Sequence, residues 1–236
     1  MQLFCFPCAG GTADFFNQLA PYLSVELVKL EYAGHGARHR EPLYENFAQL
    51  ADDLYSEVKR LYRHGETYAL LGYSMGSVAA AEVLARILRE KELPAPKHVF
   101  LAAHGPLVKR ELMRFQGDEA DKWVRERVIS LGGVPEKLLE NRTFWRMYLP
   151  LYRADFRLIT NYDFDKLTLA CEVPLTGLYG DRDLSPEEME AWRRYFHGEC
   201  EFVEYPGNHF FMTEHGREMA GLIEGRLWEG EGEDGI

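Results

Sequence analysis

Cysteine is scarce in this sequence, with four residues among 236, at positions 5, 8, 171 and 200. Thiols so few and so scattered cannot build a disulfide framework, which agrees with a reducing compartment. Cys5 and Cys8 do have the Cys-x-x-Cys spacing of thioredoxin-like redox sites. In those sites the pair opens a helix after a strand, whereas here Cys5 lies inside an apolar segment and Cys8 leads into Gly10-Gly11. We therefore do not expect a redox function.

Basic residues are also few, because 27 Lys and Arg stand against 38 Asp and Glu, a net charge of −11. Such a charge repels nucleic acid and anionic membranes unless a local basic patch intervenes. The sequence has no long apolar run, and Met1 leads straight into the strand-like segment 2–6 with no basic stretch or small-residue cleavage site. We expect neither nucleic acid nor membrane as a partner, and we expect a cytoplasmic protein.

The stretch Gly72-Tyr-Ser-Met-Gly76 stands where an apolar segment gives way to an alanine-rich one. Segment 67–72 has strand composition, and segment 77–89 repeats apolar residues at helical spacing. A serine in so tight a strand-to-helix turn is strained, and the flanking glycines leave room for the crossing backbones. The pattern is typical of a nucleophile elbow with Ser74 as the nucleophile. The alternative is a plain turn in which Ser74 caps the helix.

Strand-like and helix-like segments alternate along most of the chain. Strands are predicted over 2–7, 25–32, 67–72, 97–103, 173–179 and 200–205, and helices over 13–23, 47–61, 77–89, 185–196 and 216–227. This alternation implies parallel pairing through crossover helices, so the predicted fold class is α/β, a doubly wound sheet. Residues 1–228 have the size of one such domain.

The alternation stops between about residues 105 and 163, where helical signals continue without a clear strand. Short helices this rich in apolar residues must pack against another part of the protein. We expect them to cover the carboxyl edge of the sheet. We interpret this insertion as a helical lid, and the alternative is a set of helices that flank the core. Residues 229–236 are glycine and acidic residues with almost nothing to bury, so we expect a disordered tail.

A serine nucleophile needs a base within hydrogen-bond reach and an acid that orients the base. On an α/β-hydrolase sheet the chain order is serine, acid, histidine, each after a strand. His209 is the histidine that follows a late strand directly, in Pro-Gly-Asn-His209. For the acid, the turn Gly-Asp-Arg-Asp offers Asp181 and Asp183. We favour Asp183, which lies past the turn, and expect Asp181 to cap the turn or to pair with Arg182.

An oxyanion hole is the third requirement of acyl transfer at a serine. In this fold it is made by the backbone amide after the nucleophile and by one amide from a loop after an early strand. Met75 supplies the first amide. The loop Cys8-Ala-Gly-Gly11 should supply the second, and Ala9 is our choice.

These features resemble the type II thioesterases that accompany nonribosomal peptide and polyketide synthases, which are small α/β hydrolases with a helical lid. The segments that carry the resemblance are Phe6-Pro-Cys-Ala-Gly-Gly11, Gly34-His-Gly-Ala-Arg-His-Arg-Glu-Pro42, Gly72 to Gly76, Leu131-Gly-Gly-Val-Pro135, Leu149-Pro-Leu-Tyr-Arg-Ala-Asp-Phe156, Gly180 to Asp183 and Gly207-Asn-His-Phe-Phe211. The lid and Arg-x-x-Glu-Pro segments are not general hydrolase features, so the resemblance is specific. One departure is Tyr73, because a histidine commonly stands at this place.

The resemblance implies hydrolysis of acyl thioesters from the phosphopantetheine arm of carrier proteins, or of acyl-CoA thioesters, with no metal or redox cofactor. Carrier proteins of these systems are generally acidic, as is this chain, so docking must depend on local basic surface. The candidates are Arg38 and Arg40 in the polar loop and Lys109 and Arg110 at the start of the lid. The alternative is that these side chains are solvated or pair with nearby glutamates.

His35 and His39 are four residues apart in the same polar loop. Histidines at this spacing share a face only on a helix, and the glycines around them argue against one. We therefore do not expect a metal site there and interpret both as surface or packed histidines.

Two other functions fit parts of the sequence. An esterase or lipase acting on small free esters would need the same triad but no surface for a carrier protein. A catalytically silent binding module could keep the fold, although the intact serine, acid and histidine set argues against it. Relative rates on acyl-carrier and p-nitrophenyl esters distinguish a thioesterase from an esterase or lipase. Fluorophosphonate labelling of Ser74 distinguishes an active enzyme from a silent binding module.

Overall fold

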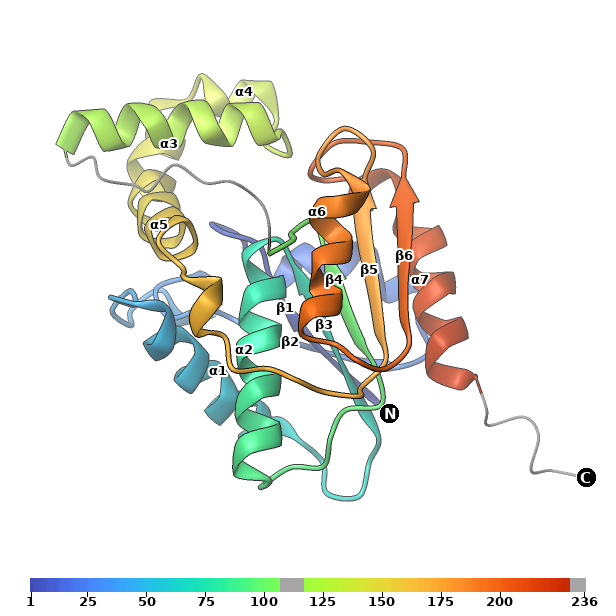
Figure 1. The fold of residues 1–236 in the computed structure, drawn as a ribbon. Coiled ribbons are helices and arrows are strands. Elements are labelled where there is room, and N and C mark those ends of the chain that lie inside the picture. Colours follow the sequence, from blue (N-terminus) through green and yellow to red (C-terminus); the bar gives the residue numbers. More distant parts are fainter. Residues whose placement is uncertain (107–116, 230–236) are drawn as a thin grey trace, which may run out of the picture.

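Six parallel strands form the sheet at the centre of the computed structural model, which describes residues 1–106 and 117–229. The strands are β1 (Gln2–Phe6), β2 (Glu26–Lys29), β3 (Tyr68–Tyr73), β4 (Val99–Ala102), β5 (Leu175–Gly180) and β6 (Cys200–Tyr205). Their order across the sheet is β2-β1-β3-β4-β5-β6, and each pair of neighbours is parallel. The predicted doubly wound α/β sheet is thereby confirmed (Figure 1).

The chain changes direction across the sheet between β1 and β3. β2 lies on one side of β1, and β3 and every later strand lie on the other. At the carboxyl edge the register pairs Phe6 of β1 with Gly72 of β3. Such a switch point opens a crevice outside the carboxyl ends of the strands, where ligands of open α/β sheets bind. The loop that begins at Cys8 and the turn at Ser74 therefore start side by side.

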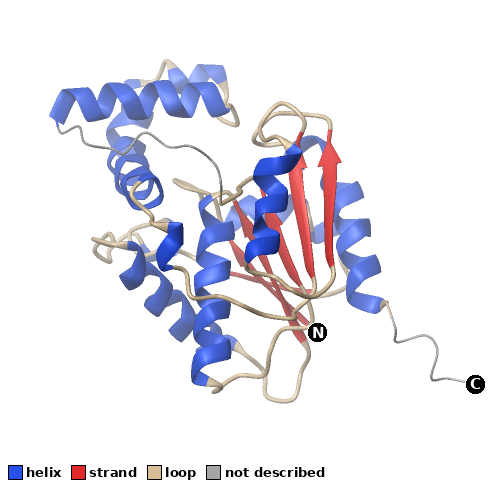
Figure 2. Ribbon diagram, in the orientation of Figure 1, coloured by secondary structure: helices blue, strands red, loops and turns tan. Residues whose placement is uncertain are grey.

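Both faces of the sheet are covered at its centre, and the strands β1, β3, β4 and β5 are buried throughout, whereas the edge strands β2 and β6 also carry exposed charged residues. Along β1, Phe4 and Phe6 belong to one hydrophobic core, whereas Leu3 and Cys5 belong to the other. This alternation follows from the two-residue period of a strand. Figure 2 shows helices on both sides of the strands, as parallel sheets require.

Four α-helices connect or cover the strands: α1 (Phe47–Leu61), α2 (Met75–Glu90), α6 (Pro186–Glu190) and α7 (Met212–Trp228). Short 3-10 helices lie at Ala13–Gln18, Ala20–Tyr22, Gly36–Arg38, Phe164–Lys166 and Ala191–Arg194. The helix predicted over 13–23 is thus two 3-10 turns, the second with Pro21 in its first turn. None of the described helices combines the length and the apolar character needed to cross a membrane.

Between β4 and β5 the described residues form the helices α3 (Gly117–Leu131), α4 (Glu136–Leu139) and α5 (Arg142–Thr160). We call these three helices the insertion. Asn141 caps α5 by accepting hydrogen bonds from the amides of Thr143 and Phe144. Figure 1 shows α3 and α4 at the end of the molecule toward which the strands point, with α5 leading back to the body. The insertion therefore lies at the carboxyl edge of the sheet.

Candidate active site

Ser74 lies in the turn between β3 and α2 with φ 55° and ψ −119°, a backbone conformation that a non-glycine residue rarely adopts. Its amide donates to the carbonyl of Ala102 at 2.7 Å, which ties the turn to β4. A Cβ atom on Gly72 would overlap the backbone of Gly76, and one on Gly76 would overlap the carbonyl of Phe6. Both glycines are therefore required by close backbone contacts, as the elbow pattern predicts.

Three polar side chains from three strand ends form one hydrogen-bonded chain. His209 Nε2 lies 2.9 Å from Ser74 Oγ, and His209 Nδ1 lies 2.8 Å from Asp183 Oδ2. Because the carboxylate accepts from Nδ1–H, Nε2 is left with a lone pair that can take the serine proton. The structure thus brings together the three residues that the sequence analysis selected, in the geometry of an activated serine.

Asp181 stands apart from this chain. Its Oδ1 accepts a hydrogen bond from the amide of Gly207 at 2.8 Å and lies 3.7 Å from Arg182 Nε. The contact with Gly207 joins the turn after β5 to the loop that carries His209. Of the two aspartates, only Asp183 contacts the imidazole, and Asp181 occupies the turn as predicted.

Tyr73 supports the histidine loop, a role that sequence reasoning missed. Its hydroxyl donates to the carbonyl of His209 at 2.8 Å, and the side chain is fully buried. The ring also stacks on that of Phe210. The sequence signalled only that a histidine commonly stands where Tyr73 does. It gave no indication that the tyrosine hydroxyl contacts the carbonyl of His209.

The two amides expected to hold an oxyanion lie beside Ser74. Met75 is the first residue of α2, so the helix N-terminus adds its partial positive charge to this amide. Ala9 lines the same cavity as Ser74. Among the residues that the structure describes, no group accepts a hydrogen bond from either amide. Neither N–H group is thus taken up by another acceptor in the described part of the chain, which is what an oxyanion donor requires.

Two cavities meet at Ser74 and His209. The first has a volume of about 210 Å³ and a mostly apolar lining that includes Val128, Val134 and Phe210. The second has a volume of about 490 Å³ and a more polar lining that includes Arg127 and Asn208. Residues of the insertion line both cavities, so the insertion shapes the space on either side of the serine.

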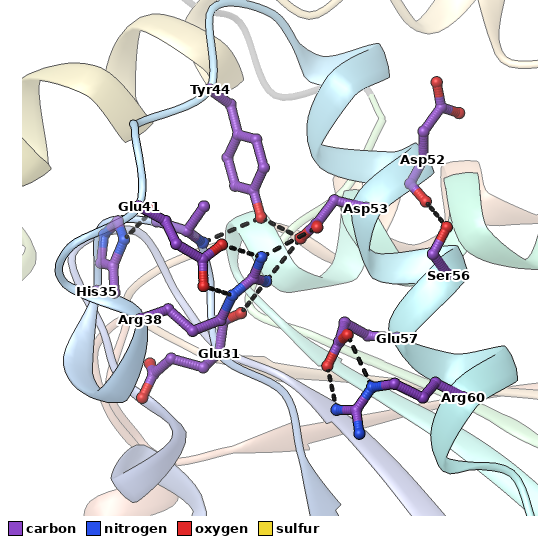
Figure 3. Close-up of polar contacts among 11 residues, drawn as sticks. Glu31, His35, Arg38, Glu41, Tyr44, Asp52, Asp53, Ser56, Glu57 and Arg60 are labelled. Atoms are coloured by element: carbon purple, nitrogen blue, oxygen red, sulfur yellow. Dashed lines mark hydrogen bonds and ion pairs between the residues drawn. The ribbon is translucent and has the colours of Figure 1, made fainter.

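Arg38 was a docking candidate with pairing to nearby glutamates as the alternative, and the structure shows the paired state. Its guanidinium donates to both carboxylate oxygens of Asp53 on α1, at 2.7 and 3.0 Å, and to the carboxylate of Glu41. Tyr44 donates to the same aspartate at 2.5 Å (Figure 3). These contacts fix the polar loop to α1, so the Arg-x-x-Glu pair has a structural role here. Arg40 is exposed.

Lys109 and Arg110, the other docking candidates, lie outside the described residues. Among the described residues, no group of three or more histidine, cysteine, aspartate or glutamate side chains could hold a metal ion. His35 and His39 flank the short 3-10 helix Gly36–Arg38. His35 is buried and His39 is exposed.

Cys8 is buried beside the cavity that reaches Ser74, and burial raises the pKa of its thiol to about 12. Burial likewise raises the pKa of Cys5, and neither residue forms a disulfide. Because the thiolate is the reactive form, neither cysteine is suited to redox exchange or to nucleophilic attack.

We predict that Cys8→Ser retains most of the hydrolytic activity, because the loop contributes a backbone amide and not the thiol. Steady-state hydrolysis of an acyl-pantetheine thioester measures the effect, with thermal melting to confirm folding. Cys8→Ala is the matched variant that removes the polar atom altogether. Complete loss of activity in folded variants would mean that the cysteine takes part in the chemistry.

The comparisons with known proteins agree with this geometry. The model of the thioesterase domain family matches residues 1–227. The chain is 30% identical over 224 residues to the gramicidin S biosynthesis protein GrsT of Aneurinibacillus migulanus, covering 93% of this chain and 86% of that protein. It is 29% identical over 216 residues to the medium-chain S-acyl fatty acid synthase thioesterase of Rattus norvegicus, covering 89% and 81%.

A solved structure gives the same result for the fold. The crystal structure of ClbQ from the colibactin NRPS/PKS pathway superposes with a TM-score of 0.86 and 26% sequence identity, covering 96% of each chain. The family match spans nearly the whole chain, including all six strands and the insertion. This chain therefore belongs to the thioesterase family and is a hydrolase that acts on thioester bonds.

Proposed function

We propose that this enzyme hydrolyses acyl thioesters from the phosphopantetheine arm of carrier proteins in nonribosomal peptide or polyketide synthesis. The observation that supports it best is the Ser74–His209–Asp183 chain at the meeting point of two cavities. One cavity can hold the acyl group while the other holds the arm. The relatives GrsT, from gramicidin S biosynthesis, and ClbQ, from the colibactin pathway, support this setting.

The chemistry begins when Ser74 Oγ attacks the thioester carbonyl carbon and His209 Nε2 takes the hydroxyl proton. The carbonyl electrons move to the oxygen, where the amides of Met75 and Ala9 stabilise the negative charge. Collapse of this intermediate breaks the carbon–sulfur bond, and His209 returns the proton to the departing thiolate. The products of this half-reaction are an acyl ester on Ser74 and a free pantetheine thiol.

Water completes the cycle by the same route. His209 removes a proton from the attacking water, and the second tetrahedral intermediate expels Ser74 Oγ, which regains a proton from the histidine. The carboxylic acid is released. In this proposal the phosphopantetheine arrives with the substrate, and every proton transfer uses the chain's own groups.

Because the protein has an acidic net charge, a local cluster of basic side chains marks a surface where an acidic partner could bind. Four arginines line one groove of about 290 Å³ between α3 and α5, with Asp121 beside them: Arg125, Arg142, Arg146 and Arg153. Arg153 pairs with Asp121 at 2.8 Å, and Arg125 lies over the ring of Trp145. Among the described residues, no carboxylate pairs with Arg142 or Arg146. This groove, which we call the arginine groove, presents concentrated positive charge to the solvent.

An acidic carrier protein is the partner that this charge fits. Long-range repulsion between two acidic proteins can be overcome by such a local patch. The helix α3 lines the arginine groove with Arg125 and lines the second catalytic cavity with Trp123 and Arg127. A helix is about 10–12 Å across. A carrier seated on the groove would therefore have its flexible arm close to the cavity entrance.

A hydrolysis panel tests the substrate class. The same acyl group is presented on a carrier protein, on pantetheine, on CoA and as a p-nitrophenyl ester. We expect the highest kcat/KM on the carrier-bound thioester. Equal or greater kcat/KM on the free ester would instead identify a small-molecule esterase of the same fold, and no turnover of any substrate would favour the silent binding module.

We predict that the double charge reversal Arg142→Glu and Arg146→Glu raises the KM for an acyl-carrier substrate severalfold and leaves hydrolysis of acyl-pantetheine nearly unchanged. Arg89→Glu, an exposed reversal on α2, is the matched control and should change neither. Reversal of Lys109 and Arg110 tests the earlier candidates in the same assay. An equal loss on both substrates would show that the groove shapes the acyl site and does not dock a carrier.

A further inference from the structure

A buried carboxylate on α5 contacts the loop that carries one of the two oxyanion amides. Asp155 Oδ2 accepts a hydrogen bond from the amide of Gly10 at 2.7 Å and lies 3.0 Å from His35 Nε2. Asp155 and His35 are each only 1% exposed. One carboxylate oxygen thus joins three segments: the insertion, the loop after β1 and the polar loop after β2. The hydrolytic steps described above do not involve this contact.

The two hydrogen-bond partners of His35 favour its charged form. Its Nδ1 lies 3.1 Å from the carbonyl oxygen of Ala33, which can only accept. Its Nε2 faces Asp155, which as a carboxylate can also only accept. With Asp155 ionised, both ring nitrogens face acceptors, an arrangement that only the imidazolium form satisfies at both positions. The contact is a buried ion pair.

The charged groups around His35 favour this state. Burial alone would lower the pKa of the imidazole, but the hydrogen bond to Asp155 and the charges of Asp155 and Glu31 outweigh it and raise the pKa. The other titratable groups near the pair are Tyr32, Tyr44, Tyr152 and Cys8. Burial raises the pKa of each, so all four remain neutral. The nearest charges facing His35 are thus both negative.

Packing makes the position of Gly10 depend on α5. Gly10 has φ +67°, and a Cβ atom there would overlap the ring of Tyr152 on the same helix. The loop therefore lies directly on α5, fixed by the ring at Gly10 and by the carboxylate on its amide. Ala9, whose amide serves the oxyanion in the proposed mechanism, is the preceding residue. A shift of Gly10 would turn this amide away from the reacting carbonyl.

We propose that Asp155 is a positioning residue, and that its ion pair with His35 fixes the loop so that the Ala9 amide completes the oxyanion hole. The oxyanion hole is then complete only when α5 is in place over the sheet. The proposal rests on the proposed function for the role of Ala9. It also makes the rate depend on the protonation of His35, a residue outside the triad.

The direction of the pH effect follows from the pKa. A histidine with a raised pKa in the folded state stabilises the fold at pH values below its ordinary pKa, and this contribution is lost as the pH rises through the raised value. A neutral His35 keeps the proton on Nε2, which faces the carboxylate of Asp155, and loses the one on Nδ1, which faces the carbonyl of Ala33. The hydrogen bond to Asp155 then loses its positive charge, and the lone pair of Nδ1 meets the carbonyl oxygen of Ala33, so we expect a looser loop and a lower kcat at alkaline pH.

Two variants test the proposal. Asp155→Asn removes the charge that holds the imidazolium, and we expect kcat for acyl-pantetheine to fall about 10- to 100-fold with little change in KM, since loss of a whole oxyanion donor costs about 10²–10³ in kcat. His35→Gln keeps an N–H donor toward Asp155 that does not titrate. It should retain most of the activity at neutral pH and lose the alkaline decline of the wild type. Asp163→Asn, at the N-cap of the 3-10 helix Phe164–Lys166, is the matched control.

The rate of Ser74 phosphonylation by a fluorophosphonate is measured alongside hydrolysis. This reaction uses the serine and the oxyanion hole but no thioester, so it remains informative if the proposed substrate class is wrong. We expect it to fall in Asp155→Asn in parallel with kcat. Unchanged labelling and kcat in that variant would overturn the proposal. If Asp155→Asn does not fold, the pH profile of kcat for His35→Gln is the test. A decline of its kcat at alkaline pH equal to that of the wild type would also overturn the proposal.

Discussion

Ser74→Ala is expected to lower thioester hydrolysis by about four or more orders of magnitude, and His209→Ala by a similar factor, because the members of a triad act as a unit. Without Ser74 Oγ no acyl ester can form, and without His209 Nε2, 2.9 Å away, nothing takes the hydroxyl proton. The loss should appear in kcat, since neither side chain is needed to hold the arm or the acyl group. Single-turnover hydrolysis of an acyl-pantetheine measures it.

Controls for these variants separate lost chemistry from lost folding. Ser74 has positive φ, so an alanine there keeps the same backbone strain and should not disturb the turn further. Thermal melting of both variants should stay close to the wild type. The double variant should be no worse than either single one. A folded single variant that kept a tenth of the wild-type activity would remove these residues from the mechanism.

Asp183→Asn should lower kcat by about 10⁴, whereas Asp181→Asn should have only a mild effect. In the wild type, Asp183 accepts from His209 Nδ1–H at 2.8 Å and so leaves Nε2 as the base. An asparagine amide group at this place can donate to Nδ1, which would put the proton on Nε2. The imidazole would then be in the wrong tautomer to receive the serine proton.

Asp181 provides the matched control within the same turn. Its contact is with the amide of Gly207, and the carbonyl oxygen of an asparagine can accept that hydrogen bond equally well. Comparing kcat for the two single variants on one acyl-pantetheine, with melting temperatures measured in parallel, distinguishes the two carboxylates. If Asp181→Asn were the more damaging change, the orienting role would pass to that residue.

Features that depend on neighbouring residues could be predicted from the sequence. The elbow was visible because its glycines and its strand-to-helix change lie within a few positions of Ser74. The alternation of strands and helices predicted a parallel sheet, and a parallel sheet places all strand ends on one edge. His209 and Asp183 could then be selected because each follows a strand that ends there.

Other features depend on contacts that no local pattern records. For Arg38 the sequence left docking and pairing with nearby glutamates both open, and the fold brings Glu41 and also Asp53 of α1 against its guanidinium. His35 was interpreted as a surface or packed histidine, and its partner Asp155 lies 120 residues further along the chain. Whether a charged side chain is solvated or paired depends on which groups meet it after folding, and sequence spacing cannot decide this.

The sequence by itself therefore determined the parallel α/β sheet, the turn at Ser74 and the candidates for base and acid, because hydrophobic periodicity and turn residues act over short distances along the chain. Only the tertiary structure decided that Asp183 and not Asp181 contacts His209, that Tyr73 reaches the carbonyl of His209, and that two cavities meet at the serine. These choices depend on hydrogen-bond geometry and burial. Both are set by the packing of segments that are far apart in sequence.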